Sequence, residues 1–304
     1  MKKSHTTNSK QRVKRPRAPS HGEAQKRAPR TTKRRPKIKG PIPLASRKHR
    51  VHLAYAAGLS EAPHLGPAAS LIEQGRTTNF VVSYDPALGD AGPIVAGYLL
   101  QACEYDYSRA ASIFQAAPAN LPFEISLVCS SGGAWHENPC TNPAIGVGAI
   151  TTNPPDALFL RNLMLSEVVE VLSATLNNGW KCDFSNGEAL SRVIADALAP
   201  CTKPCDFRTA PVWLTFRENW VDRTDFTDRN YHSIGCGVLF LNWLQYQLGY
   251  SWEQIVAAGA STLELTYESL TGKTDGFTSF KDQVEAKYPP GVPTNVTSDN
   301  IFPF

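Results

Sequence analysis

The hydrophobic pattern of this 304-residue chain changes its period at Asn153-Pro154-Pro155, and this change limits the fold more than any other feature. Between residues 77 and 150, short runs rich in β-branched and aromatic residues indicate strands. After the two prolines, apolar residues recur every three to four positions over longer segments, which indicates helices. Strands followed by helices are typical of an α+β domain. We expect a small N-terminal sheet with one long helix, followed by a mostly helical subdomain.

The expected strands are short. They are Asn79–Tyr84, Phe123–Cys129 and Ala144–Ile150, with an extended segment at Gly133-Ala134-Trp135-His136. A long helix, from Asp90 to about Phe114, connects the first two strands, because Asp90 can cap it and its apolar residues have helical spacing.

The expected helices of the second part are longer and strongly apolar. They are Asp156 to about Leu176, Asn186–Leu198, Asn230–Leu248, a helix opening at Ser251, Thr262–Leu270 and Phe277–Tyr288. The segment Asn230–Leu248 is so apolar that we expect it at the centre of the helical part. Two segments show neither the strand pattern nor the helix pattern, and we expect a loop at Pro200–Pro211 and an irregular tail from Pro289.

The charges divide the chain into two unlike parts. Residues 1–50 contain 18 Lys or Arg and one acid, Glu23, so their net charge is +17. The other 254 residues contain 13 basic and 26 acidic side chains, a net charge of −13. The sequence therefore predicts an acidic folded body that carries a strongly basic arm.

The basic arm lacks Phe, Trp and Tyr, and its like charges repel one another, so we expect it to be disordered. Its runs Arg12–Arg17 and Lys33–Lys37 are typical of segments that bind nucleic acid phosphates or direct a protein to the nucleus. A solvated tail without a specific partner is the alternative.

The arm continues into a segment rich in Ala, Gly and Pro, residues 51–76, which we interpret as a linker. The folded domain is expected over residues 77–290, and residues 291–304 form the irregular tail. No segment reaches the roughly 18 consecutive apolar residues of a membrane-spanning helix, so we expect no transmembrane segment. No classical secretory signal is visible, which favours the cytoplasm by default, or the nucleus in a eukaryotic cell.

The chain has seven cysteines, and this odd number without a visible signal peptide favours reduced, mostly buried thiols. In an oxidising compartment, Cys129 with Cys140 and Cys201 with Cys205 can each form a local disulfide. Zinc binding by Cys201 and Cys205 lacks a second close pair of ligands.

Three glutamates form the pattern that indicates chemistry. Glu167 and Glu170 are three residues apart on one helix and share a face, and the surrounding side chains are apolar. Two carboxylates in such a setting must reach solvent, take up protons, pair with an arginine or hold a cation. Glu188 begins the next helix and can approach the first pair if the two helices pack antiparallel.

The order of elements over residues 77–290, together with this helix pair, resembles the gluzincins, the thermolysin-like and aminopeptidase-like zinc metallopeptidases. Their signature is His-Glu-x-x-His on one helix and a glutamate on the next. Ser166 takes the place of the first histidine, and Glu167 that of the general-base glutamate. Glu170 takes the place of the second histidine. Glu188, in Asn-Gly-Glu-Ala-Leu, takes the place of the third ligand.

The resemblance implies roles for further residues and a peptide or protein substrate. Gly133-Ala134-Trp135-His136 would hold an extended peptide by strand addition, and Tyr231 or His232 would act as the electrophile near the scissile carbonyl. Glu167 would activate a water molecule, and Glu170 with Glu188 would hold the metal.

Both histidine ligands of the signature are missing, which changes the expected chemistry. Carboxylates suit hard ions such as calcium or magnesium and leave a bound water less acidified, so zinc, another divalent cation and no metal are all left open. His136 or His232 can supply one nitrogen, although no spacing requires it. We therefore expect a metallopeptidase-like protein that is hydrolytically degenerate.

Three alternatives are kept beside this interpretation. Glu167 and Glu170 can form salt bridges to Arg161 or Arg192 at a solvent groove. The protein can be a non-enzymatic binding module that uses its basic arm on nucleic acid or an anionic surface. It can also be a thiol enzyme in which His232 serves Cys236 one helical turn away; Cys236 is otherwise expected in close helix packing, between two glycines.

Overall fold

The computed structural model describes residues 70–130, 133–149, 156–200 and 208–304, and these residues form an α+β domain. The predicted fold class is therefore confirmed. The basic arm, most of the linker and the pair Cys201 and Cys205 lie outside the described residues, so their predicted roles stay predictions.

The described sheet has five strands in the order β1-β2-β3-β5-β4. They are β1 (Ile72–Arg76), β2 (Phe80–Tyr84), β3 (Phe123–Cys129), β4 (Gly133–His136) and β5 (Ala144–Ala149). The inner strands β2, β3 and β5 run parallel, and the two edge strands pair antiparallel with them. Four of the strands lie where the pattern predicts them.

Strand β1 differs from the prediction, because residues 51–76 were expected to be a linker. Its five residues are exposed or only partly buried, so no alternating apolar side chains reveal the strand in the sequence. It is held instead by its backbone pairing with β2, in which Ile72 is paired with Tyr84 and Arg76 with Val81.

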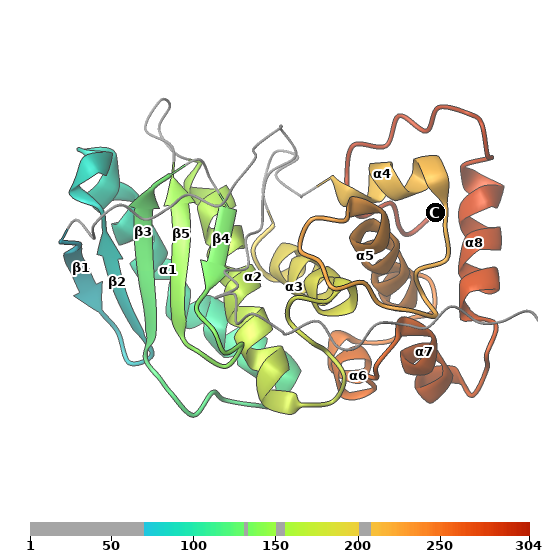
Figure 1. Cartoon of the computed structure of the whole chain (residues 1–304), viewed down its shortest axis with the longest axis horizontal. Helices are drawn as coiled ribbons and strands as arrows, with labels where there is room; N and C mark the ends of the chain where they lie inside the picture. Colours follow the sequence, from blue (N-terminus) through green and yellow to red (C-terminus); the bar gives the residue numbers. More distant parts are fainter. Residues whose placement is uncertain (1–69, 131–132, 150–155, 201–207) are drawn as a thin grey trace, which may run out of the picture. The chain divides into compact units, whose positions relative to one another are not determined.

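Two helices cover one face of the sheet (Figure 1). Helix α1 (Ala91–Phe114) packs on β1 and β2 and supplies the crossover that the parallel strands β2 and β3 require. Helix α2 (Ala157–Leu176) packs on β4 and β5 and also contacts α1. The side chain of Asp156 caps the start of α2 by accepting hydrogen bonds from two backbone amides.

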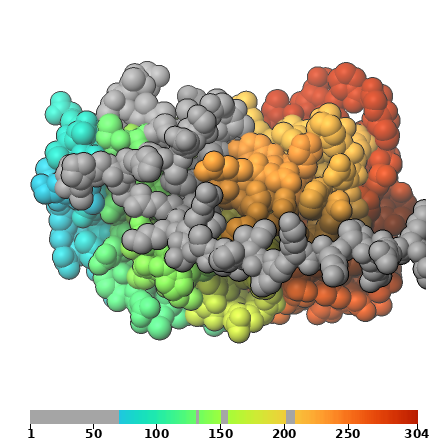
Figure 2. Space-filling model, in the orientation of Figure 1, coloured from blue at the N-terminus to red at the C-terminus, as the bar shows by residue number. Residues whose placement is uncertain are grey.

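The helical part is built around α5 (Tyr231–Tyr246), as its apolar sequence predicts. The other members are α3 (Ser185–Leu198), α4 (Thr209–Phe216), α6 (Trp252–Ala257), α7 (Leu263–Thr271) and α8 (Gly276–Lys287). Helix α5 contacts α3, α4, α6 and α7. Figure 2 shows the sheet region in blue to green and this helical region in yellow to red, in chain order.

Helix α4 is the one α-helix of the described residues that the pattern did not predict, because it is short and contains a proline in its first turn. In the described part of the chain, no helix combines the length and the apolar composition that crossing a membrane requires.

Close helix packing around Cys236 is confirmed. A Cβ atom on Gly235 would collide with the backbone of Thr209 on α4, and one on Gly237 would collide with the side chain of Ala189 on α3. Both glycines therefore let neighbouring helices approach α5 closely.

Replacing Gly235 with alanine should lower the free energy of unfolding by about 1–3 kcal/mol, because the rigid backbone at Thr209 must move. Urea unfolding of the full chain measures this loss. Gly97→Ala is the matched control: it also lies in a helix, and its new methyl group would meet only the end of Gln74, at 3.5 Å. Equal stability of the two variants would contradict the packing argument.

A buried carboxylate and histidine cluster as the candidate functional site

Helices α2 and α3 lie antiparallel, as the sequence interpretation required. Near one end, the side-chain amide of Asn162 on α2 donates to the backbone carbonyl of Ala199, just after α3, at 3.5 Å. In the middle, the hydroxyl of Ser191 on α3 donates to Oε1 of Glu170 on α2 at 3.0 Å. This arrangement brings the predicted glutamates of both helices into one region of the core.

Glu170 also contacts His136, the last residue of β4. Nε2 of His136 lies 3.2 Å from Oε2 of Glu170, and Nδ1 lies 3.3 Å from the backbone oxygen of Glu137. Burial alone lowers the pKa of His136, but the hydrogen bond to Glu170 and the charge of its carboxylate outweigh burial, so the pKa is raised overall. The sequence left a role for this imidazole open, and the structure places it against the second glutamate.

Among the described residues, Glu167 is the glutamate of the cluster whose carboxylate has neither a hydrogen bond nor an ion pair, whereas Glu188 lacks hydrogen bonds to its carboxylate but is paired with Arg192. Glu167 is fully buried, and neither of its carboxylate oxygens has a hydrogen-bond partner among the described residues. One ligand atom from each of His136, Glu167 and Glu170 lies within 4.8 Å of the other two. Burial, and then the charges of Glu170 and Glu188, raise the pKa of Glu167 well above its usual value. Such a carboxylate requires a proton or a cation.

Glu188 lies on α3 and pairs with Arg192 one turn later. Its Oε2 is 3.6 Å from Nη2 of the guanidinium, and both side chains are buried. Burial, and then the charge of Glu170, raise the pKa of Glu188 well above its usual value, while Arg192 acts in the opposite direction. The predicted metal ligand is therefore part of the same charged cluster, but it has its own cationic neighbour.

The salt-bridge alternative, in which Arg161 or Arg192 pairs with Glu167 and Glu170, is wrong in its partners. Arg161 pairs with Asp106, with Nε 2.6 Å from Oδ2, and so is directed away from the glutamates. Arg192 is beside the cluster, but the carboxylate that it contacts belongs to Glu188. Neither arginine therefore neutralises Glu167 by direct contact.

The two residues proposed as electrophiles, Tyr231 and His232, have different surroundings. Tyr231 lies under the guanidinium of Arg192, 5.9 Å from it, and is thus at the margin of the cluster. The ring of His232 packs edge-on against Phe216, with 4.4 Å between the ring centres, which indicates a packing role. Ser166, in the place of a metal-binding histidine, donates its hydroxyl hydrogen to the backbone oxygen of Asn162.

The predicted substrate strand is an edge strand, as expected. However, all four residues of β4 are buried, and the indole of Trp135 fills the space above Gly146 on β5. Peptide binding by strand addition therefore requires this edge to become uncovered.

The solvent groove expected in front of the glutamates is not present in the described structure. Glu167 and Glu188 are 0% exposed, and Glu170 is 1% exposed. A cavity of about 10 Å³ lies beside Arg192. Its lining also contains Asn162, Val193, Asp196, Val238, Asn242 and Asp299. A cavity of this volume holds about one water molecule, and none of the three glutamates is among its lining residues.

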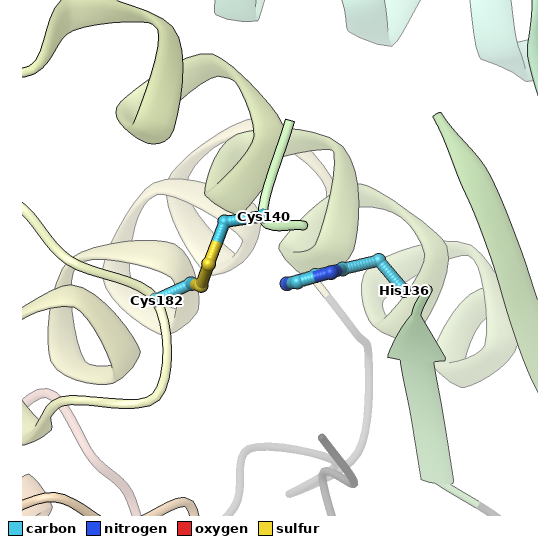
Figure 3. Close-up of side chains that lie close together, drawn as sticks. All are labelled: His136, Cys140 and Cys182. Carbon is cyan, nitrogen blue, oxygen red and sulfur yellow. A yellow bond between two sulfur atoms is a disulfide. The ribbon is translucent and has the colours of Figure 1, made fainter. Parts of the chain in front are cut away.

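A disulfide between Cys140 and Cys182 lies next to the cluster. It joins the turn after β4 to the turn before α3, with 6.2 Å between the Cα atoms. Figure 3 shows the ring of His136 pointing toward the two sulfur atoms. The prediction of reduced thiols is therefore wrong at Cys140 and Cys182. The predicted pair of Cys129 with Cys140 is also wrong, because Cys129 is free and exposed. The true partner is 42 residues away, which sequence spacing does not reveal.

The thiol-enzyme alternative is not favoured. Cys236 is fully buried, and burial raises its pKa to about 12, so a thiolate is scarce at neutral pH. The ring that would activate it, on His232, packs against Phe216.

The fold and the site together define an α+β domain with a buried cluster of one histidine and three glutamates beside a disulfide. No protein-family model matches the chain, and no curated protein or solved structure matches it either. Kinship with the metallopeptidases therefore remains a proposal that rests on the residues and their arrangement.

The buried Glu167 predicts that the metal-free protein loses stability as pH rises. The folded chain keeps a proton that the unfolded chain releases above about pH 4.5, so the free energy of unfolding falls above that pH until folded Glu167 ionises. The slope from one such group is at most about 1.4 kcal/mol per pH unit. Glu167→Gln should flatten this dependence in urea unfolding between pH 5 and 8 with EDTA present.

The control for this experiment is Glu268→Gln, which changes an exposed glutamate on α7. It should follow the wild-type curve. Parallel curves for wild type and Glu167→Gln would show that Glu167 does not hold a proton in the folded state.

Proposed function

We propose that this protein is a metallopeptidase-like domain that binds a divalent cation at His136, Glu167 and Glu170 and does not hydrolyse peptides. The observation that carries the proposal is the fully buried Glu167 carboxylate, within 4.8 Å of two further ligand atoms. Among the described residues, its two oxygens have no hydrogen-bond partner. A cation would satisfy these oxygens and offset the repulsion between Glu167 and Glu170.

The donor set suits such an ion. Imidazole and carboxylate ligands bind zinc and manganese, and three protein ligands with an open position are typical of functional zinc sites. At the usual metal–ligand distances the donor atoms lie about 3.5 Å from one another. Nε2 of His136 and Oε2 of Glu170 are already 3.2 Å apart, so any approach that is needed concerns Glu167. Nε2 of His136 would exchange its contact with Glu170 for the ion.

Glu188 has a different role in this proposal from the one expected of it. Its carboxylate lies beside Arg192 and raises the pKa of Glu167 through space. We therefore assign it to the charge balance of the site, with Arg192, and not to the ligand set. When Glu188 is ionised, its negative charge favours a cation at the neighbouring carboxylates.

The absence of hydrolysis follows from access and from ligand chemistry. The three glutamates are buried, so a peptide bond cannot reach Glu167 in this conformation. A water bound to a carboxylate-rich ion is also less acidified than one in a histidine-rich site. In this proposal the protein resembles the metallopeptidases in its scaffold and its bound cation, but it does not hydrolyse peptides.

Cation binding is tested with the full chain under non-reducing conditions and with Mn²⁺, which prefers oxygen and nitrogen ligands. We expect one bound Mn²⁺ per chain in titrations followed by electron paramagnetic resonance. At a hundred times the dissociation constant, the ion should add about 2.7 kcal/mol to the free energy of unfolding. Glu167→Gln should weaken binding at least tenfold, and Glu268→Gln should leave it unchanged. Absent binding, or equal binding by Glu167→Gln, would overturn the proposal.

Hydrolysis is tested separately with the metal-loaded full chain and an unstructured protein such as casein. The wild-type chain and Glu167→Gln should give the same background rate, because the buried carboxylate does not reach substrate. Cleavage that depends on Glu167 would show an active peptidase and would refute the degenerate assignment, while leaving the cation site intact.

A further inference from the structure

Two cysteines and one histidine meet beside the carboxylate cluster. Cys140 follows β4 by four residues, Cys182 precedes α3, and His136 ends β4. One nitrogen of His136 and the two sulfur atoms all lie within 4.8 Å of one another. His136 and Cys182 are buried, and Cys140 is partly buried, so the group is largely withdrawn from solvent.

The chemistry of this group changes with its oxidation state. In the disulfide the sulfur atoms are poor ligands, whereas two thiolates and one imidazole form a set that zinc prefers. The required atoms come from two turns that the fold already holds together, since β4 pairs with β5 and α3 packs on α2. Little rearrangement of the backbone is therefore needed to form the site.

A fourth donor is close by. Oε2 of Glu170 lies 3.2 Å from Nε2 of His136. Two cysteines, one histidine and one further oxygen ligand complete the four-coordinate geometry usual for zinc.

We propose that reduction of the Cys140–Cys182 disulfide creates a zinc site formed by Cys140, Cys182 and His136. A dithiol reductant transfers two electrons and two protons to the disulfide and becomes a disulfide itself. Zinc then binds the two sulfur atoms as thiolates, and the two protons are released. The inference does not depend on the cation site proposed above, although both sites use His136, so only one of the two ions binds at a time.

The test uses the full chain, reduced with dithiothreitol, freed of reductant without oxygen, and titrated with Co²⁺ and then Zn²⁺. The reduced chain should bind one ion and show the near-ultraviolet absorption of a cobalt–thiolate bond, which zinc then removes. The oxidised chain should show no such absorption. Cys182→Ser should abolish the absorption, and Cys129→Ser, which removes an exposed free thiol, should leave it unchanged.

Two further variants keep the test decisive if Cys182→Ser folds poorly. His136→Gln keeps both cysteines and should weaken cobalt binding at least tenfold. The double variant Cys201→Ser/Cys205→Ser should bind as the wild type does. Absence of thiolate absorption in the reduced chain, or its loss only in the double variant, would overturn the inference.

The two proposals fail independently. Glu167→Gln should lose Mn²⁺ in the oxidised chain but keep the cobalt–thiolate absorption in the reduced chain. Loss of the absorption in Glu167→Gln would contradict a sulfur-based site.

Discussion

The close packing of α2 against α3 places Glu167, Glu170 and Glu188 in a region that water does not reach, with one guanidinium beside them. Like charges at this spacing in a low dielectric oppose folding by several kcal/mol unless something compensates. The hydroxyl of Ser191 and the imidazole of His136 contact Glu170, and the guanidinium of Arg192 contacts Glu188. The carboxylate of Glu167 has no such contact among the described residues. The chemistry proposed for the protein follows from this remaining imbalance.

The sequence predicts most of the fold because local patterns determine it. Strand β3 alternates, helix α1 has apolar residues at helical spacing, and helices α2 and α5 are strongly apolar with caps of the expected types at Asp156 and Asn230. The two elements that the pattern missed lack such a signal. Strand β1 is an edge strand with exposed side chains, and α4 is short with a proline in its first turn.

The site was predictable only where it depends on helical spacing. Glu167 and Glu170 share a face because they are three residues apart, and Glu188 joins them once α2 and α3 are antiparallel. The contact of Glu170 with His136 and the pairing of Cys140 with Cys182 join distant parts of the chain, and no spacing encodes them. Burial of the cluster was also missed, since solvent access depends on the packing of all neighbouring elements.

The disulfide has a consequence for the unfolded chain as well as for the site. It closes a loop across 42 positions, and the chain-entropy model assigns such a loop about 4 kcal/mol of stabilisation. Opening this link both frees two thiols and enlarges the unfolded ensemble. The reduced molecule is then less stable than the oxidised one and more readily degraded by proteases, so the redox state of its surroundings would influence its lifetime.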